Sequence, residues 1–188
     1  MKFKEGKIID TMNIEKNGKK IEVVLRYPKK GDFKDVWKFY NKVIKETEGL
    51  SRFSPVTLSE EKKWIDGVLG KMKKGSMTQI LVESNGKIVG SASIERKKEE
   101  RRSHVGDFGI AVLQEFTGIG IGKKLIIEIE KESRKMNLGI IALSVHGKNK
   151  VAQNLYRKMG FRISGTIPKS VKTGNGFDAN ITMYKVLK

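Results

Sequence analysis

Two hydrophobic periods alternate along the chain, and each change of period predicts the boundary of a helix or a strand. Apolar residues spaced three and four apart predict about four helices, and short runs rich in β-branched residues predict the strands between them. The first clear strand is expected over 21–27, where Pro28 ends it. Residues 1–16 show no clear period, and we expect a short extra strand or an N-terminal arm there.

Two of the predicted helices follow this strand directly. Apolar residues at helical spacing cover 33–45, and the capping box Thr57-Leu58-Ser59-Glu60 opens a second helix that is expected to end near Gly75. The other two helices are expected after the glycine-rich segment 117–122 and over 148–159. Gly160 suits the C-terminal end of the last of them.

The remaining apolar runs predict strands, several of them joined by tight turns. Asn17-Gly18 and Asn85-Gly86 are typical hairpin dipeptides. The order of elements predicts a mixed α/β fold, a central sheet of about six or seven strands flanked by about four helices. We expect one domain over residues 1–188. The further strands are expected over 77–82, 87–94, 105–113, 140–145, 161–167 and 177–186.

The composition narrows the chemistry and the location. None of the 188 residues is cysteine, so no disulfide, thiolate nucleophile or cysteine metal site is available, and we expect no metal. No apolar run approaches the roughly 18–20 residues that span a bilayer. The N-terminus has no apolar segment typical of a secretory signal. We therefore expect a cytoplasmic protein with no membrane partner.

The net charge of +18, from 39 Lys and Arg against 21 Asp and Glu, leaves the choice of partners open. Such a field attracts polyanions, so association with a ribosome or nucleic acid is one interpretation. The other is a lysine-rich surface of the kind enriched in thermophiles. A homodimer is also compatible with the sequence.

The segment Thr117-Gly118-Ile119-Gly120-Ile121-Gly122 lies between a predicted strand and a predicted helix. Alternate glycines allow the backbone to approach a ligand closely, and the free N–H groups of a helix N-terminus favour an anion. Lys123 adds positive charge. We expect a pyrophosphate cradle there. The segment is not a P-loop, because the Gly-Lys-Ser/Thr ending is missing, and it follows too many elements for a dinucleotide-binding unit.

Two stretches, 108–125 and 149–161, resemble the strand–turn–helix motif and the Asn-to-Tyr, Gly-Phe pattern of the GCN5-related N-acetyltransferase (GNAT) superfamily. The resemblance covers roughly residues 20–188. The closing segment 172–178 is similar to the ribosomal-protein and phosphinothricin-type acetyltransferases. The resemblance implies an enzyme that transfers an acetyl group from acetyl-CoA to a primary amine, directly, within a ternary complex.

The resemblance also implies roles for individual residues. The strand backbone would hold the pantetheine arm and polarise the thioester carbonyl, the turn would hold the pyrophosphate, Asn149 would hydrogen-bond the CoA arm, and Tyr156 would protonate the departing thiolate. Tyr156 shares a helical face with apolar residues, so a core position is the alternative. The implied cofactor-binding residues are Ile110, Ala111, Val112, Gly118, Ile119, Gly120, Ile121, Gly122, Lys123 and Asn149.

Two positions depart from the family pattern and leave the general base open. Thr117 stands where Gln or Arg is usual, and Ser144 stands where some members carry a glutamate base. Asp107 is one candidate base, acting through water, and its alternative is a salt bridge to the Arg101-Arg102 loop. His146, on the same strand face as Ser144, is the second candidate, and its alternative is a helix cap.

Without a strong base, an acceptor that is easy to deprotonate is favoured. An α-amine, with a pKa of about 7.8, loses its proton far more readily than a lysine side chain at about 10.4. We therefore expect a protein N-terminus or a free amino acid as the acceptor. The alternatives are a GNAT-like protein that binds CoA or RNA without catalysis, and an acetyltransferase acting on aminoacyl-tRNA or polyamines.

Overall fold

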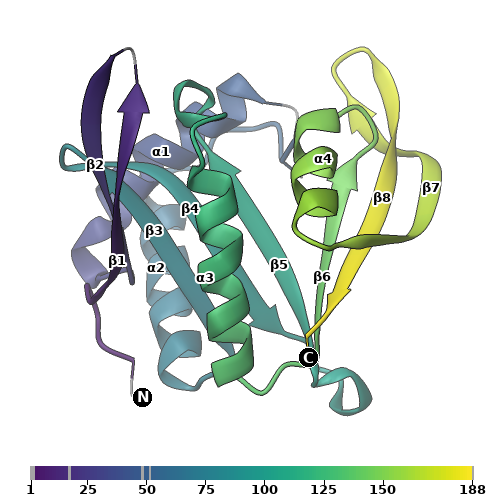
Figure 1. Ribbon diagram of the computed structural model, residues 1–188, viewed down its shortest axis with the longest axis horizontal. Coiled ribbons are helices and arrows are strands. Elements are labelled where there is room, and N and C mark those ends of the chain that lie inside the picture. Colours follow the sequence, from purple (N-terminus) through teal and green to yellow (C-terminus); the bar gives the residue numbers. More distant parts are fainter. Residues whose placement is uncertain (1–2, 17, 48, 51, 188) are drawn as a thin grey trace.

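The computed structural model describes residues 3–16, 18–47, 49–50 and 52–187 (Figure 1). Within them eight strands form one sheet and four α-helices pack around it. The elements are β1 Ile8–Lys16, β2 Lys19–Arg26, α1 Phe33–Glu46, α2 Leu58–Lys73, β3 Met77–Ser84, β4 Lys87–Arg96, β5 Val105–Val112, α3 Ile121–Lys135, β6 Ile140–His146, α4 Lys150–Lys158, β7 Arg162–Thr173 and β8 Gly176–Val186.

The predicted α/β class and the order of elements from the second strand onward are confirmed. The sheet has one strand more than expected, because residues 8–16 form β1, which pairs antiparallel with β2. Ile14 is the one hydrophobic residue of β1 that is fully buried, so the strand lacks a clear alternation. In the expected Asn17-Gly18 turn, Asn17 lies outside the described residues, and Gly18 has a φ of +71°.

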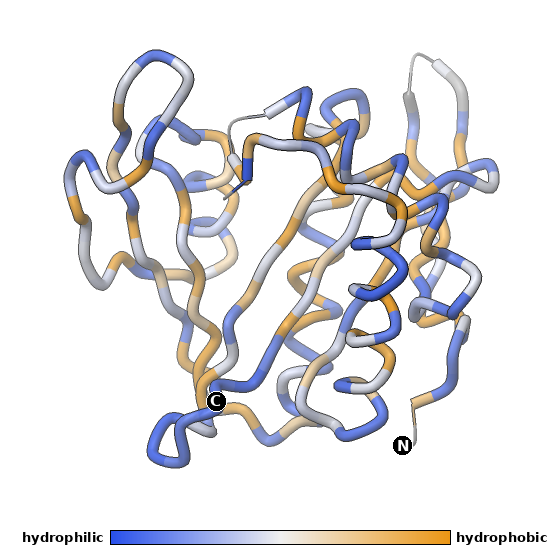
Figure 2. Tube along the Cα trace, turned by 180° about the vertical axis from the view of Figure 1, so that it is seen from behind, coloured by the Kyte–Doolittle hydropathy of each residue, from blue (hydrophilic) through white to orange (hydrophobic). Residues whose placement is uncertain are grey.

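The strands are ordered β1-β2-β3-β4-β5-β6-β8-β7, and every neighbouring pair is antiparallel except β5–β6, which is parallel. α1 and α2 lie against one face of the sheet and α3 against the opposite face (Figure 1). Hydrophobic positions follow the strands and the helices, whereas the loop after β4 is hydrophilic (Figure 2). The main core therefore fills the space on both sides of β3, β4 and β5.

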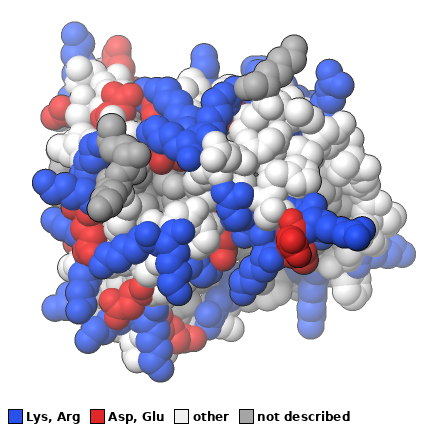
Figure 3. Space-filling view, turned by 90° about the horizontal axis from the view of Figure 1, so that it is seen from below, with Lys and Arg blue, Asp and Glu red and all other residues white. Residues whose placement is uncertain are grey.

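Charged side chains of both signs share the face shown in Figure 3. Lys and Arg side chains are scattered there with acidic side chains among them, part of the face carries neither, and the basic side chains do not form a single stripe. Among the described residues, no helix combines the length and the apolar character that crossing a membrane requires.

Candidate active site

The central feature of the site is a gap between β5 and β6. These strands pair over only three residue pairs, from Val105–Ile140 to Asp107–Ala142, and then diverge (Figure 1). β5 continues to Val112, paired with β4 on its other side. Ile110, Ala111 and Val112 therefore have no strand partner on the β6 side within the described residues, and this divergence of β5 and β6 is called the cleft below. The pantetheine role of these residues stays a prediction.

The glycine turn stands at the open end of this cleft, between β5 and α3. Gly118 and Gly120 have φ angles of +77° and +92°, which side-chain-bearing residues adopt only with strain. Gly120 is the N-cap of α3, no side chain caps that helix, and its first turn holds no acid. A Cβ on Gly122 would stand 3.0 Å from Leu155 Cδ2 of α4, so the turn packs closely against that helix. The N-terminus of α3 is thus open to an anion.

The two lysines beside this turn differ in their surroundings. The Lys123 side chain is exposed. Lys124 is ion-paired with Asp10 of β1 and, at 3.2 Å, with Glu128 of α3. The hydrogen bond from Lys124 lowers the pKa of Asp10. Lys124 therefore ties the extra strand to α3, and Lys123 is the lysine that is left to contact a ligand.

Asn149 and Tyr156 come from α4, across the cleft from β5. Asn149 is the N-cap of α4, where its Oδ1 accepts a hydrogen bond from the Ala152 amide at 3.0 Å. Its Nδ2 is left for another partner and lies beside Gly49 of the α1–α2 loop, 3.4 Å from where a Cβ on that residue would be. The same side chain can thus cap the helix and donate to a ligand.

Tyr156 is buried, 6% exposed, in an aromatic cluster. Its ring lies edge-on to Phe108 of β5 and tilted against Phe161, with centroid separations of 6.2 and 5.8 Å. Burial raises the pKa of the phenol to about 12, so the hydroxyl stays protonated at neutral pH. No hydrogen bond to this hydroxyl exists within the described part of the chain. The ring is therefore part of the core, while its proton remains available, and the predicted acid role stays a prediction.

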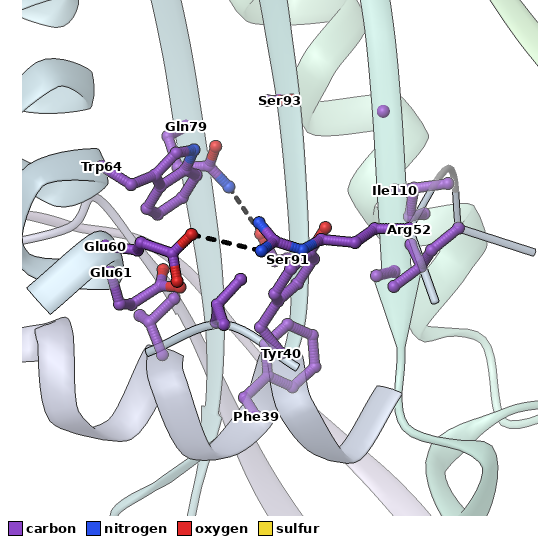
Figure 4. A pocket seen from close by; sticks show the side chains of 15 residues that line it. Phe39, Tyr40, Arg52, Glu60, Glu61, Trp64, Gln79, Ser91, Ser93 and Ile110 are labelled. Carbon is purple, nitrogen blue, oxygen red and sulfur yellow. Dashed lines mark hydrogen bonds and ion pairs between the residues drawn. The ribbon is translucent and has the colours of Figure 1, made fainter. Parts of the chain in front are cut away.

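A cavity of about 510 Å³ opens on the face of the sheet that α1 and α2 cover (Figure 4). Neither the hydrophobic pattern nor the motifs of the sequence predict this cavity. It reaches Ile110 and Ala111 of β5, so it meets the cleft at the same strand. Its apolar wall consists of Val36, Phe39, Tyr40, Leu50, Val56, Trp64, Ile110 and Ala111.

The polar groups of this cavity gather on one side and on its floor. Arg52 Nη2 lies 3.2 Å from Glu60 Oε1, and Gln79 Nε2 donates to Ser91 Oγ at 2.5 Å. Glu61, from α2, is only 5% exposed. Burial, and to a lesser extent the neighbouring Glu60, raises the pKa of Glu61 to about 7. A carboxylate in this place can accept a proton near neutral pH.

The two bases considered from the sequence lie outside this cavity. Asp107 has a side chain that is 57% exposed and ion-paired with Lys97 at 2.6 Å, not with the Arg101-Arg102 loop. It borders a shallow depression with the loop after β4. His146 ends β6, and its carbonyl accepts a hydrogen bond from Gln153 at 3.0 Å. The roles of both stay predictions. In the described part of the chain, no group of three or more His, Asp and Glu side chains is placed to hold a metal ion.

The site therefore combines a splayed parallel strand pair, an open glycine turn and a facing helix that carries Asn149 and Tyr156. The sequence pattern of the Acetyltransferase (GNAT) family matches residues 37–161, and the chain therefore belongs to this family. The family resemblance expected from the two motifs is confirmed.

Similarity to individual proteins agrees with this assignment. The chain is 35% identical over 103 residues to the L-amino acid N-acetyltransferase of Escherichia coli, and the match covers 54% of this chain and 64% of that protein. The chain thus spans slightly less than two thirds of that relative.

Two solved structures show the same fold. The ribosomal-protein-alanine N-acetyltransferase of Brucella melitensis is 22% identical with a TM-score of 0.78, covering 87% of this chain and 99% of that one. The phosphinothricin acetyltransferase of Sinorhizobium meliloti, in complex with acetyl-CoA, is 16% identical with a TM-score of 0.78, covering 88% of each chain.

Proposed function

We propose that this protein transfers the acetyl group of acetyl-CoA to the α-amine of a free amino acid, directly, within a ternary complex. One observation carries the proposal: the cleft between β5 and β6 and the cavity under α1 and α2 meet at Ile110 and Ala111. A donor in the cleft and an acceptor in the cavity would meet across this strand, and proximity supplies much of the rate. The single domain and the cytoplasmic location expected from the sequence belong to the same proposal.

The residues of the cleft fit acetyl-CoA. The open N-terminus of α3 and the left-handed glycines suit a pyrophosphate, with Lys123 beside them. Nδ2 of Asn149 would donate to the pantetheine arm. The cosubstrate supplies the thioester, whose carbonyl oxygen would be polarised by a backbone N–H of the segment 110–112. Acetyl-CoA in the S. meliloti structure supports this choice of donor.

Tyr156 would complete the donor side of the reaction. When the amine attacks and the C–S bond breaks, the CoA thiolate needs a proton. The phenol, kept protonated by burial, is placed on α4 facing β5 and can supply it. Because the chain has no cysteine, direct transfer is favoured over a cysteine-bound acyl intermediate.

The cavity favours a small zwitterionic acceptor. An amino acid carries an ammonium group and a carboxylate, and the cavity wall carries the carboxylate of Glu61 and the guanidinium of Arg52. The E. coli relative is named as an L-amino acid N-acetyltransferase, which supports the same class. The α-amine of a free amino acid also has a lower pKa than a lysine side chain, so deprotonating it at pH 7 costs less free energy.

A screen of acceptors tests the proposal. CoA release from acetyl-CoA is followed with the standard L-amino acids, a peptide with a free N-terminus, a peptide with only a lysine amine, spermidine and an aminoacyl-tRNA. We expect turnover with several amino acids and little with the other acceptors. Turnover with peptides or tRNA alone would contradict the acceptor class, and CoA binding with no turnover on any amine would contradict catalysis.

A further inference from the structure

One acidic side chain of the cavity has no partner. The Glu61 residue is only 5% exposed. No hydrogen bond or ion pair reaches its carboxylate from any residue that the structure describes. Its oxygens are not among the fully buried polar atoms, so they open into the cavity, where their charge is only partly hydrated and lacks a protein partner. Its presence in the cavity therefore indicates a ligand group that completes it.

The start of α2 fixes where this carboxylate points. Thr57 caps the helix: its Oγ1 accepts from the Glu60 amide at 3.2 Å, and the Glu60 carboxylate accepts from the Thr57 amide at 2.7 Å. Glu60 is thereby turned back toward the helix end, where it also meets Arg52 (Figure 4). Glu61 stands one position on, four residues before the buried Ile65, so it faces the sheet and the cavity.

The charged and titratable groups around Glu61 leave it uncompensated. Tyr40 faces it from α1, Glu60 lies beside it on α2, and Arg52 comes from the loop between these helices. Arg52 is held by Glu60 and by the Ser54 carbonyl, which accepts from its Nε at 3.0 Å. From the sheet, Gln79 and the serines of β4 bring no charge. An ammonium group has the charge that would compensate Glu61 in this cavity.

We propose that Glu61 binds the ammonium group of the acceptor and takes one proton from it before the amine attacks acetyl-CoA. This rests on the proposed function, because it assigns the acceptor side of that same site. Glu61 is then a catalytic residue that touches the substrate, and the acceptor is an amine that enters the cavity as a cation.

Two protons leave the nitrogen of the acceptor during the proposed reaction. The ammonium group gives one proton to the Glu61 carboxylate, which passes it to solvent after turnover. The neutral nitrogen then forms the N–C bond to the acetyl carbon, and the C–S bond breaks. The thiolate takes a proton from Tyr156. The second proton that leaves the nitrogen then restores the phenol. The net products are the amide, CoA as a thiol and one proton.

Glu61→Gln tests the assignment, with Asp66→Asn as the matched control. Asp66 is an exposed carboxylate on the same helix and away from the cavity lining. For an amino acid substrate, kcat/KM of Glu61→Gln should fall roughly 100-fold or more at pH 7, as for a lost proton acceptor. The deficit should shrink to about tenfold or less near pH 9.5, because solution then supplies the free amine. Asp66→Asn should match wild type throughout.

Two further variants make the result decisive. Glu61→Asp keeps a carboxylate and should retain the pH profile at a reduced rate. Asp107→Asn should show no pH-dependent loss if Glu61 is the proton acceptor. A deficit of Glu61→Gln that is the same at every pH, or a pH-dependent loss in Asp107→Asn alone, would overturn the inference. The wild-type rate tests the proposed function separately, since a wild type without turnover fails before any variant is compared.

Discussion

The two sides of the site are built by different means. On the donor side, backbone would do most of the binding: the described residues give β5 no partner on its β6 side from Phe108 onward, and a glycine turn opens the N-terminus of α3. On the acceptor side, side chains from α1, α2, the loop between them and three strands enclose a cavity. A site built from backbone can bind the same ligand while its side chains vary. A site built from side chains selects its acceptor through the identity of those side chains.

The largest expected effect comes from disrupting the backbone site. Gly120→Asp places a side chain at a φ of +92° and a negative charge at the open helix N-terminus. Acetyl-CoA should raise the melting temperature of the wild type by mass action and should not raise that of the variant. Thermal melts with and without acetyl-CoA measure this. Gly67→Asp, at an open helical position of α2, is the control. A melting shift of normal size in Gly120→Asp would contradict a pyrophosphate site at this turn.

The next effect separates the two roles of Tyr156. Tyr156→Phe keeps the ring against Phe108 and Phe161 and removes only the hydroxyl, which makes no hydrogen bond within the described chain. The kcat should fall roughly 10- to 1000-fold while the acetyl-CoA melting shift is unchanged. Pre-steady-state kinetics distinguish the chemical step from product release. Full activity in the chemical step would leave Tyr156 a core residue.

On the acceptor side, loss of activity should come with a gain in stability. The folded-state pKa of Glu61, about 7, lies above its ordinary value of 4.5, so the folded state holds this proton more tightly than the unfolded state does. Stability is therefore lost as pH rises from 4.5 through 7. Glu61→Gln should recover up to about 3 kcal/mol at pH 8 and nothing near pH 4. Urea unfolding at both pH values measures this, and equal effects at both would argue against a charged, desolvated Glu61.

The smallest effect distinguishes the two lysines of the glycine turn. Lys123→Ala should weaken acetyl-CoA binding a few-fold, with a smaller dependence on salt and an unchanged melting temperature, because its charge is exposed. Lys124→Ala should lower stability by about 1 kcal/mol, because it breaks the link between α3 and β1. Calorimetric titration and melts compare them. A larger binding loss in Lys124→Ala would reverse the assignment.

The same contrast explains what the sequence could predict. The glycine turn and the seven-residue interval from Asn149 to Tyr156 are local, so a single stretch of sequence contains them. The cavity joins residues from 36 to 111 that come together only in the fold. The local indication of the cavity is Glu61, a charged residue on the buried face of α2, which continues with Ile65, Val68 and Met72.

The hydrophobic pattern also does not predict the full extent of two strands, β7 and β1. β7 runs to Thr173, past the expected end at residue 167. The sequence does not mark this end, because all residues of β7 from Arg162 to Ser170 are exposed and a strand without a buried face has no hydrophobic alternation. For residues 1–16 the sequence predicts a strand or an arm for a related reason, since Asp10 and Asn13 interrupt the apolar residues of β1. Its pairing with β2 comes from tertiary structure.

We propose that an amino acid α-amine in the cavity meets acetyl-CoA in the cleft. The most direct measurement is the rate of CoA release at pH 7 with L-methionine, compared with Nα-acetyl-L-lysine, which offers only a side-chain amine, and with spermidine. We expect a kcat/KM for the α-amine at least about tenfold above either rival, because the α-amine of a free amino acid loses its proton more readily than a lysine side chain. Faster turnover of the lysine amine or of spermidine would contradict it.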